Sequence, residues 1–120
     1  MKKLMVLAGI LSMLSAVPSQ ASAAGVEDEI GLQMYTLRNV GTPAEQFAMA
    51  HKAGFEHVEL VGTQGLAAKE LKSLLDKNHL TVTSSHVQLT ALESDYAQTV
   101  AFNKAVGNHT IVVPWIKPED

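Results

Sequence analysis

Four short runs of apolar and β-branched residues recur along the chain, separated by longer segments with apolar residues at helical spacing. The runs lie at 30–35, 58–61, 81–86 and 110–113. Their length of four to six residues is typical of strands, and each intervening segment can hold a helix. Within the last run, Ile111-Val112-Val113 is continuously apolar, as in a parallel strand buried on both faces. The pattern predicts the order β-α-β-α-β-α-β.

The first predicted helix has the clearest boundaries. Thr42 and Glu45 have the spacing of a capping box, and Pro43 occupies the first helical position, where its missing N–H costs nothing. Phe47 begins the buried stripe, and Gly54 can end the helix in a left-handed conformation.

The other two helices have weaker start signals. The second covers 67–77, without a side-chain cap, and buries three leucines: Leu71, Leu74 and Leu75. The third begins either at a capping box over 90–93 or at Ser94, and ends at Gly107. Its inward face is predicted to hold Tyr96, Val100, Ala97, Ala101 and Ala105.

Helices between successive strands favour right-handed crossovers and a parallel sheet. Two architectures share this order, the open doubly wound sheet and the closed (β/α)₈ barrel, and both bind ligands beyond the carboxyl ends of their strands. No Gly-x-Gly-x-x-Gly follows the first strand, and the chain has no Gly-Lys-Ser/Thr phosphate loop. A nucleotide-binding open sheet is therefore disfavoured.

Residues 1–23 have the parts of a secretory signal peptide. Two lysines precede an apolar stretch over 4–16, and Ala21-Ser22-Ala23 is a small-x-small cleavage pattern. The apolar stretch is shorter than the roughly 20 residues of a membrane span, and no cysteine follows it for lipid attachment. We expect a periplasmic or secreted protein without a stable membrane anchor, beginning with a flexible acidic leader over 24–29.

Charge and cysteine content exclude some partners and some kinds of site. Without residues 1–23 the chain has 97 residues, of which seven are basic and 12 acidic, giving a net charge of −5. This balance argues against nucleic acid as a partner. The absence of cysteine excludes disulfides and thiolate metal sites. A chain of this size forms one domain.

Four strings at the predicted strands carry a family resemblance: IGLQMYTLR at 30–38, AGFEHVEL at 53–60, HLTVTSSHV at 79–87 and IVVPW at 111–115. Together they resemble the sugar phosphate isomerase/epimerase family, a xylose isomerase-like group of TIM barrels that shares its fold with endonuclease IV. Such barrels take about 250 residues. The resemblance therefore implies that residues 30–120 form the N-terminal half of a TIM (β/α)₈ barrel.

The resemblance also implies chemistry for a full-length parent. It implies a divalent metal (Mn, Mg, Co or Zn), held mainly by Glu, Asp and His residues of later strands, and no metal bound by this fragment. The parent is expected to be an exported isomerase or epimerase acting on a sugar or related polyhydroxy compound. The fragment itself is expected to be inactive and to self-associate through exposed strand edges.

Five residues near the predicted strand ends are the candidate substrate-binding residues: Gln33, Tyr35, Glu59, His86 and Trp115. The two aromatic rings can stack on a sugar, the amide can bind hydroxyls, and the carboxylate can accept hydrogen bonds. The imidazole suits proton transfer or ligand binding, and the endonuclease-like branch has a zinc-binding histidine near this strand end. No catalytic residue is assigned, and no metal spacing such as His-Glu-x-x-His links the candidates.

Some of these residues also have structural interpretations. Glu59 can pair with a basic neighbour inside the barrel, and Trp115 can pack against a loop. Arg38, just past the first strand, can bind an anionic substrate, although a helix-cap or ion-pair role is favoured. For the whole protein, a non-catalytic sugar-binding protein on the same barrel is the alternative, and a DNA-repair function is disfavoured by the acidic charge.

Overall fold

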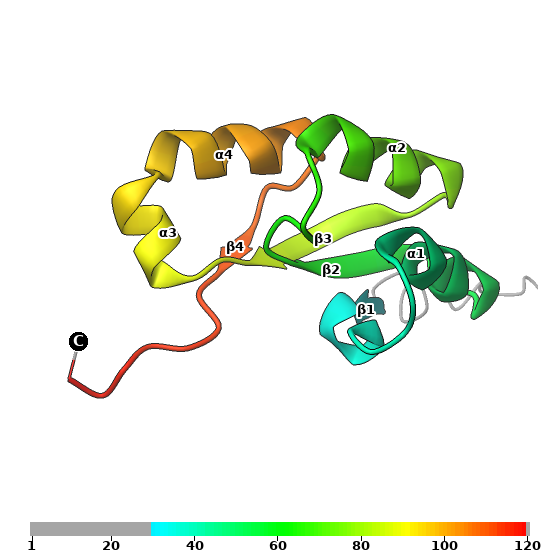
Figure 1. The fold of residues 1–120 in the computed structure, drawn as a ribbon, viewed down its shortest axis with the longest axis horizontal. Helices are drawn as coiled ribbons and strands as arrows, with labels where there is room; N and C mark the ends of the chain where they lie inside the picture. Colours follow the sequence, from blue (N-terminus) through cyan, green and yellow to red (C-terminus); the bar gives the residue numbers. More distant parts are fainter. Residues whose placement is uncertain (1–29, 120) are drawn as a thin grey trace, which may run out of the picture.

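The computed structural model describes residues 30–119, which form a parallel sheet with helices between its strands (Figure 1). The four strands lie in the order β1-β2-β3-β4, and every neighbouring pair is parallel. Their bounds are β1 Gly31–Gln33, β2 His57–Val61, β3 Thr81–His86 and β4 Ile111–Val112. The predicted α/β repeat and parallel sheet are confirmed. The predicted signal peptide (1–23) and leader (24–29) lie outside the described residues.

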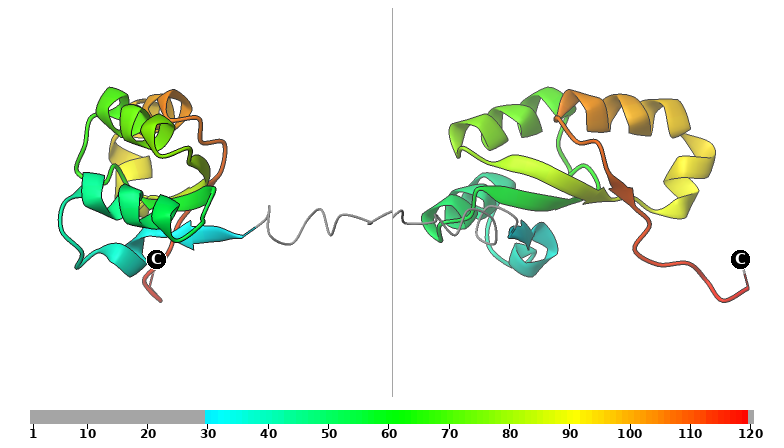
Figure 2. Two further views of the ribbon diagram at one scale, coloured as in Figure 1. Left: turned by 90° about the vertical axis from the view of Figure 1, so that its right-hand side faces the viewer. Right: turned by 180° about the vertical axis from the view of Figure 1, so that it is seen from behind.

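Five helices connect these strands: the 3₁₀ helix η1 (Met34–Leu37), α1 (Pro43–Lys52), α2 (Ala68–Lys77), α3 (Leu89–Ser94) and α4 (Tyr96–Ala105). Figures 1 and 2 show α2 and α4 side by side against the sheet, with α3 beyond its carboxyl end. Between residues 30 and 119, no helix has the length and apolar composition needed to cross a membrane.

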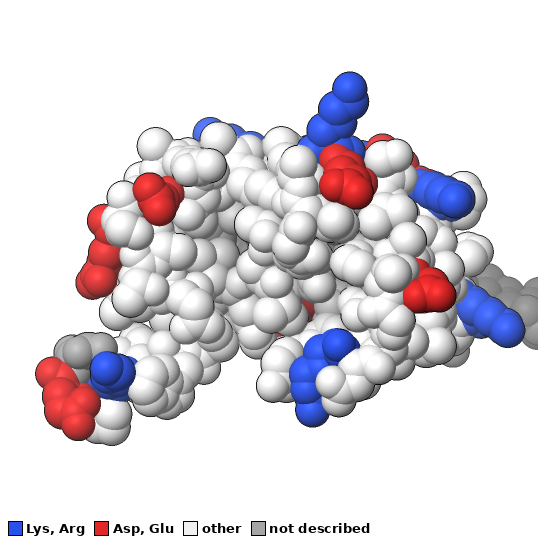
Figure 3. All heavy atoms as spheres, viewed as in Figure 1, with Lys and Arg blue, Asp and Glu red and all other residues white. Residues whose placement is uncertain are grey.

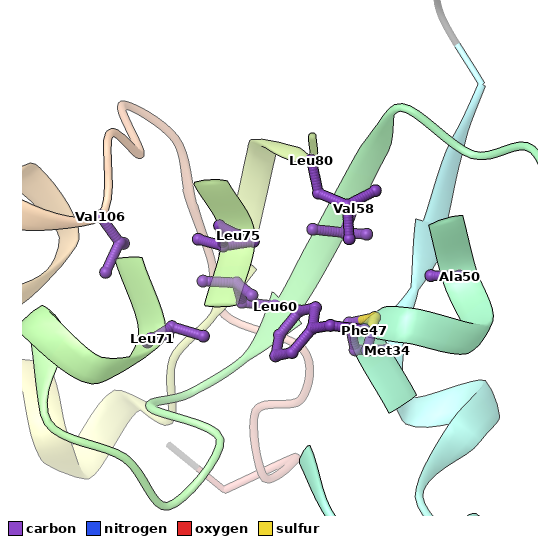
Figure 4. Close-up of a cluster of buried hydrophobic side chains, with 9 residues drawn as sticks. All are labelled: Met34, Phe47, Ala50, Val58, Leu60, Leu71, Leu75, Leu80 and Val106. Atoms are coloured by element: carbon purple, nitrogen blue, oxygen red, sulfur yellow. The ribbon is translucent and has the colours of Figure 1, made fainter. Parts of the chain in front are cut away.

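Strand β2 supplies the centre of the core. Val58 and Leu60 are fully buried and pack against Phe47 of α1 and Leu71 of α2 (Figure 4). Because side chains alternate along a strand, Glu59 between them is directed to the opposite face of the sheet. The packing of β2 against the helices therefore determines which face carries polar groups.

The capping box predicted for the first helix is confirmed. The Thr42 hydroxyl accepts a hydrogen bond from the Glu45 N–H at 3.3 Å, and the Glu45 carboxylate accepts one from the Thr42 N–H at 2.7 Å. The Thr42 N–H and, to a lesser extent, the Thr42 hydroxyl donate to the Glu45 carboxylate and hold the pKa of Glu45 below its ordinary value. Pro43 is the first helical residue, and Gly54 follows the helix at a φ of +93°.

The first strand is shorter than predicted. It ends at Gln33, and the chain turns at once into η1, closed by a hydrogen bond from the Arg38 N–H to the Tyr35 carbonyl. The turn buries Met34, which is only 1% exposed, against the core. Tyr35 therefore lies on a helical turn beyond the strand end.

The region predicted as a third helix is two helices, and the predicted capping box over 90–93 is wrong. Gln88 is the N-cap of α3 without a side-chain hydrogen bond, and Thr90 lies inside the helix. The chain leaves helical geometry at Asp95, where φ is −133°, and α4 then begins at Tyr96. Because of this break, helical spacing counted along one continuous helix does not give the face that α4 turns to the sheet.

Most of the predicted inward face of α4 is therefore wrong. Tyr96 is 65% exposed, and the three predicted alanines (Ala97, Ala101 and Ala105) are exposed as well, while Val100 is half-buried. The side facing the sheet instead includes Phe102 and Asn103. A pattern of apolar residues cannot predict a buried asparagine. Asn103 is tolerated in this position because its side chain is hydrogen-bonded: its Nδ2 donates to the Thr99 carbonyl at 2.8 Å, and its Oδ1 accepts from the Asn108 amide at 2.7 Å.

We predict that Thr42→Ala lowers the free energy of unfolding by about 1 kcal/mol, because it removes the N-cap acceptor of α1. Thr90→Ala is the matched control, since it makes the same chemical change at an exposed position inside α3. Its expected effect is within about 0.5 kcal/mol. Urea denaturation followed by circular dichroism measures both. Equal losses in the two variants would contradict this assignment of the caps.

Candidate functional site

Polar side chains from three strands meet on the face of the sheet opposite the core. Gln33 at the end of β1 lies opposite Glu59 of β2, and Glu59 lies opposite Ser84 of β3. His86 ends β3 two residues further on and is on the same face. The structure thus brings together three of the residues proposed from the sequence, with a serine that was not proposed.

The Glu59 carboxylate is the centre of this cluster. One of its oxygens, Oε1, is 2.8 Å from Gln33 Nε2 and 2.9 Å from His86 Nε2. The other, Oε2, accepts a hydrogen bond from the Ser84 hydroxyl at 2.5 Å. Three donors from two neighbouring strands therefore surround one half-buried carboxylate, as expected for an ionised group that is partly shielded from water.

The hydrogen bonds keep Glu59 ionised. The Ser84 hydroxyl makes the largest contribution and lowers the pKa of Glu59 below its ordinary value. Partial burial opposes this effect and raises the pKa, while the Gln33 amide and the His86 ring lower it further. The net direction is downward, so the carboxylate is charged at neutral pH.

The orientation of the His86 ring follows from its neighbours. Because the carboxylate can only accept, the ring nitrogen facing it, Nε2, carries the proton. The Gln33 amide nitrogen, 3.4 Å from the same Nε2, is also a donor and forms no hydrogen bond with it. In the neutral ring, Nδ1 is then the acceptor, available to a proton or a ligand hydroxyl.

A cavity of about 550 Å³ opens at the carboxyl end of the sheet beside this cluster. Its walls include four of the five proposed residues: Gln33, Tyr35, His86 and Trp115. Tyr35 is 51% exposed and Trp115 60% exposed, and one face of the Tyr35 ring is covered by the Arg38 guanidinium. Glu59 lies behind the wall and holds Gln33 and His86. In Figure 3 the charged side chains of this view lie mostly around the outline of the molecule.

Ser84 and Phe102 are among the residues of the site that were missed from the sequence. Ser84 lies two residues before His86 and therefore shares its face of the strand, a signal that strand alternation provides. Phe102 of α4 forms part of the cavity wall, and it was missed because the phase of that helix was misjudged. Arg38 has the predicted helix-cap role: it is the C-cap of η1, and its Nη1 donates to the Tyr35 carbonyl at 3.0 Å.

The described residues do not form a metal site by themselves. Between residues 30 and 119, no group of three His, Cys, Asp or Glu side chains is placed to hold a metal ion. Glu59 and His86 are adjacent, but both carboxylate oxygens already accept hydrogen bonds. Structural and catalytic zinc sites need at least three protein ligands, and residues 30–119 do not bring three together.

The sequence matches no protein-family model and no curated protein. Among solved structures, the chain is similar to a protein described as a sugar phosphate isomerase/epimerase from Parabacteroides distasonis, with a TM-score of 0.55 and 21% sequence identity. The match covers 72% of this chain and 42% of that chain. The chain has the fold of half a TIM barrel. It spans less than half the length of this structural neighbour, and identity at this level shows the fold alone.

We predict that Ser84→Ala raises the pKa of Glu59 towards its ordinary value, because the variant removes the largest contribution that lowers it. A lowered folded-state pKa stabilises the fold above the ordinary pKa of glutamate, and this stability is lost as the pH falls through the folded-state value. Ser84→Ala should therefore lower the unfolding free energy at neutral pH by about 1–2 kcal/mol and flatten its dependence on acidic pH.

Carbon-detected NMR titration of the Glu59 carboxyl and urea denaturation at several pH values measure these two effects. Ser73→Ala, on the exposed surface of α2, is the matched control and should change neither. An unchanged Glu59 titration in Ser84→Ala would show that the Ser84 hydrogen bond is not formed in solution.

Proposed function

We propose that the cavity at the carboxyl end of the sheet binds a sugar or a related polyhydroxy compound, and that the whole protein is an exported, metal-dependent sugar isomerase or epimerase. The observation that carries the proposal is the arrangement of hydrogen-bonding and aromatic groups around one cavity. Gln33 and His86 are held by Glu59 at the wall, and Tyr35 and Trp115 expose their rings beside them. The structural neighbour described as a sugar phosphate isomerase/epimerase supports the reaction class.

Each group has a role in this proposal that its contacts support. The Gln33 carbonyl oxygen and the His86 Nδ1 accept hydrogen bonds from sugar hydroxyls, because their N–H groups face Glu59. The Tyr35 and Trp115 rings cover the apolar face of the sugar. Glu59 keeps both polar groups oriented and is not free to act as a base while it accepts their hydrogen bonds.

The proposed reaction moves a proton between neighbouring carbons through an enediol or keto intermediate. The group that removes the carbon-bound proton is not assigned to any described residue. A divalent metal (Mn, Mg, Co or Zn) belongs to the proposal for the whole protein, with ligands from outside residues 30–119. Residues 30–119 alone do not fit a metal site.

A non-catalytic sugar-binding protein is the second candidate. One observation favours it. Glu59, the carboxylate next to the cavity wall, accepts hydrogen bonds from three donors and holds the Gln33 and His86 side chains in position. Catalysis of the proposed type exchanges a carbon-bound hydrogen of the sugar with solvent. Proton NMR of aldoses and ketoses in D₂O with the whole protein therefore separates the two functions: binding with exchange supports the enzyme, and binding without exchange supports the sugar-binding protein.

We predict that sugars change the fluorescence of Trp115, the one tryptophan of the chain, because it lies in the cavity wall. His86→Ala should weaken sugar binding about tenfold, a loss of about 1.4 kcal/mol. His109→Ala, at an exposed position outside the cavity, is the control and should bind as the parent does. The proposal fails if no sugar alters the fluorescence or if both histidine variants lose binding equally.

Export is proposed from the sequence of the first 23 residues. We predict that the protein recovered from the periplasm or medium begins at Ala24, as intact-mass spectrometry measures. Ala23→Asp should block cleavage and leave the precursor with the membrane fraction. An uncleaved cytoplasmic product from the parent gene would contradict export. Free or oxidised sugars suit an exported protein better than sugar phosphates, which are mostly cytoplasmic.

A further inference from the structure

A second, smaller cavity of about 280 Å³ adjoins the first. Tyr35 and Val61 line both cavities, so these two side chains lie between them. The smaller cavity is otherwise lined by groups that can donate hydrogen bonds, Arg38, Gln46 and Gln64, with the apolar Met34 and Pro43. The larger cavity has no arginine or lysine among its lining residues. The two cavities therefore offer different chemistry to the two ends of one ligand.

Gln64 carries the first indication of a ligand. Its side-chain nitrogen, Nε2, is buried and has no hydrogen-bond partner among residues 30–119. Its backbone is also left-handed, with a φ of +56°, between Gly62 and Gly65, which have φ values of +59° and +72°. A buried donor without an acceptor and a left-handed glutamine both cost stability, and such costs cluster at binding sites.

Arg38 carries the second indication. Its guanidinium lies over the Tyr35 ring, 4.2 Å from the centroid, and its Nη1 bonds the Tyr35 carbonyl. No carboxylate of residues 30–119 lies within ion-pair distance of it. A guanidinium has five N–H groups, so this cation is held in place by Tyr35 with donors to spare.

Gln46 completes the polar wall. It lies on the second turn of α1, is only 7% exposed and lines the same cavity. Two amide side chains and one guanidinium thus line a small space, to which the exposed Arg38 brings a positive charge and Gln64 a buried N–H without a partner among residues 30–119. Such a set matches an oxyanion, which accepts several hydrogen bonds and benefits from the charge.

We propose that this smaller cavity binds the anionic group of the substrate, a carboxylate or a phosphate ester, while its hydroxyls occupy the larger cavity. The inference rests on the proposed function and narrows the substrate class to an anionic polyhydroxy compound, such as a sugar acid or a sugar phosphate. Arg38 supplies the charge and Gln64 the buried donor. Tyr35 orients Arg38 and contacts the sugar, so it connects the two subsites.

The test compares ligands that differ only in the anionic group. Gluconate is compared with glucitol, and glucose 6-phosphate with glucose, by Trp115 fluorescence, with inorganic phosphate as a separate probe. The anionic member of at least one pair should bind about tenfold or more tightly than its neutral partner. A preference for gluconate identifies a carboxylate site, and one for glucose 6-phosphate a phosphate site. In NMR spectra the side-chain NH₂ signal of Gln64 should shift with the preferred anion.

Three variants localise the effect. Arg38→Met and Gln64→Met remove the charge or the donor at similar side-chain length, and each should reduce the preference to about twofold or less. Lys69→Met, which removes an exposed cation of α2 outside both cavities, is the control and should keep the full preference.

Two results would overturn the inference while leaving the proposed function in place: equal affinity for the neutral and anionic member of both pairs, or a preference that Arg38→Met and Gln64→Met both retain. If neither neutral nor anionic sugars bind at all, the proposed function fails and the anion subsite fails with it. Thermal melts of each variant show whether a lost preference reflects a lost fold.

Discussion

The burial of one face of β2 is the constraint on which the rest of this structure depends. Val58 and Leu60 are fully buried against the helices, so the strand cannot rotate or slip by one residue without exposing both. Alternation then places Glu59 on the opposite face, although no bond made by Glu59 is needed to put it there. The hydrophobic core thus fixes the position of a carboxylate that it does not contain, and Gln33, Ser84 and His86 gather around it.

The irregularity between β2 and β3 completes this arrangement. Val58 lies opposite Val82, but Glu59 lies opposite Ser84, so Thr83 is an extra residue in the ladder. In a regular strand, Ser84 and His86 would share the core face with Val82. The extra residue reverses the alternation, so that Ser84 and His86 meet Glu59 while Ser85 is buried on the other side. A bulge in the third strand therefore decides which polar residues take part in the site.

The same sheet separates the residues that form the core from those that line the cavities. Residues that pack against the helices hold the strands in register, and residues at the carboxyl end are left to line two adjoining cavities. The short β1 contributes to both, because the chain turns into η1 directly after Gln33. That turn buries Met34 in the core while it exposes Tyr35 between the cavities. This division is the usual one for parallel α/β folds, whose ligands bind beyond the carboxyl ends of the strands.

The sequence by itself determined the order of the elements, the parallel sheet and the start of α1, because these follow from local signals such as hydrophobic spacing and the Thr42 cap. It also indicated Gln33, Glu59 and His86, since polar residues at strand ends of this architecture face one edge. The phase of α4, the meeting of Ser84 with Glu59 and the presence of Arg38 and Gln64 around one cavity were decided only by the tertiary structure. The first depends on a helix break, the second on the bulge between β2 and β3, and the third on how two loops come together, and the hydrophobic spacing of the chain predicts none of these.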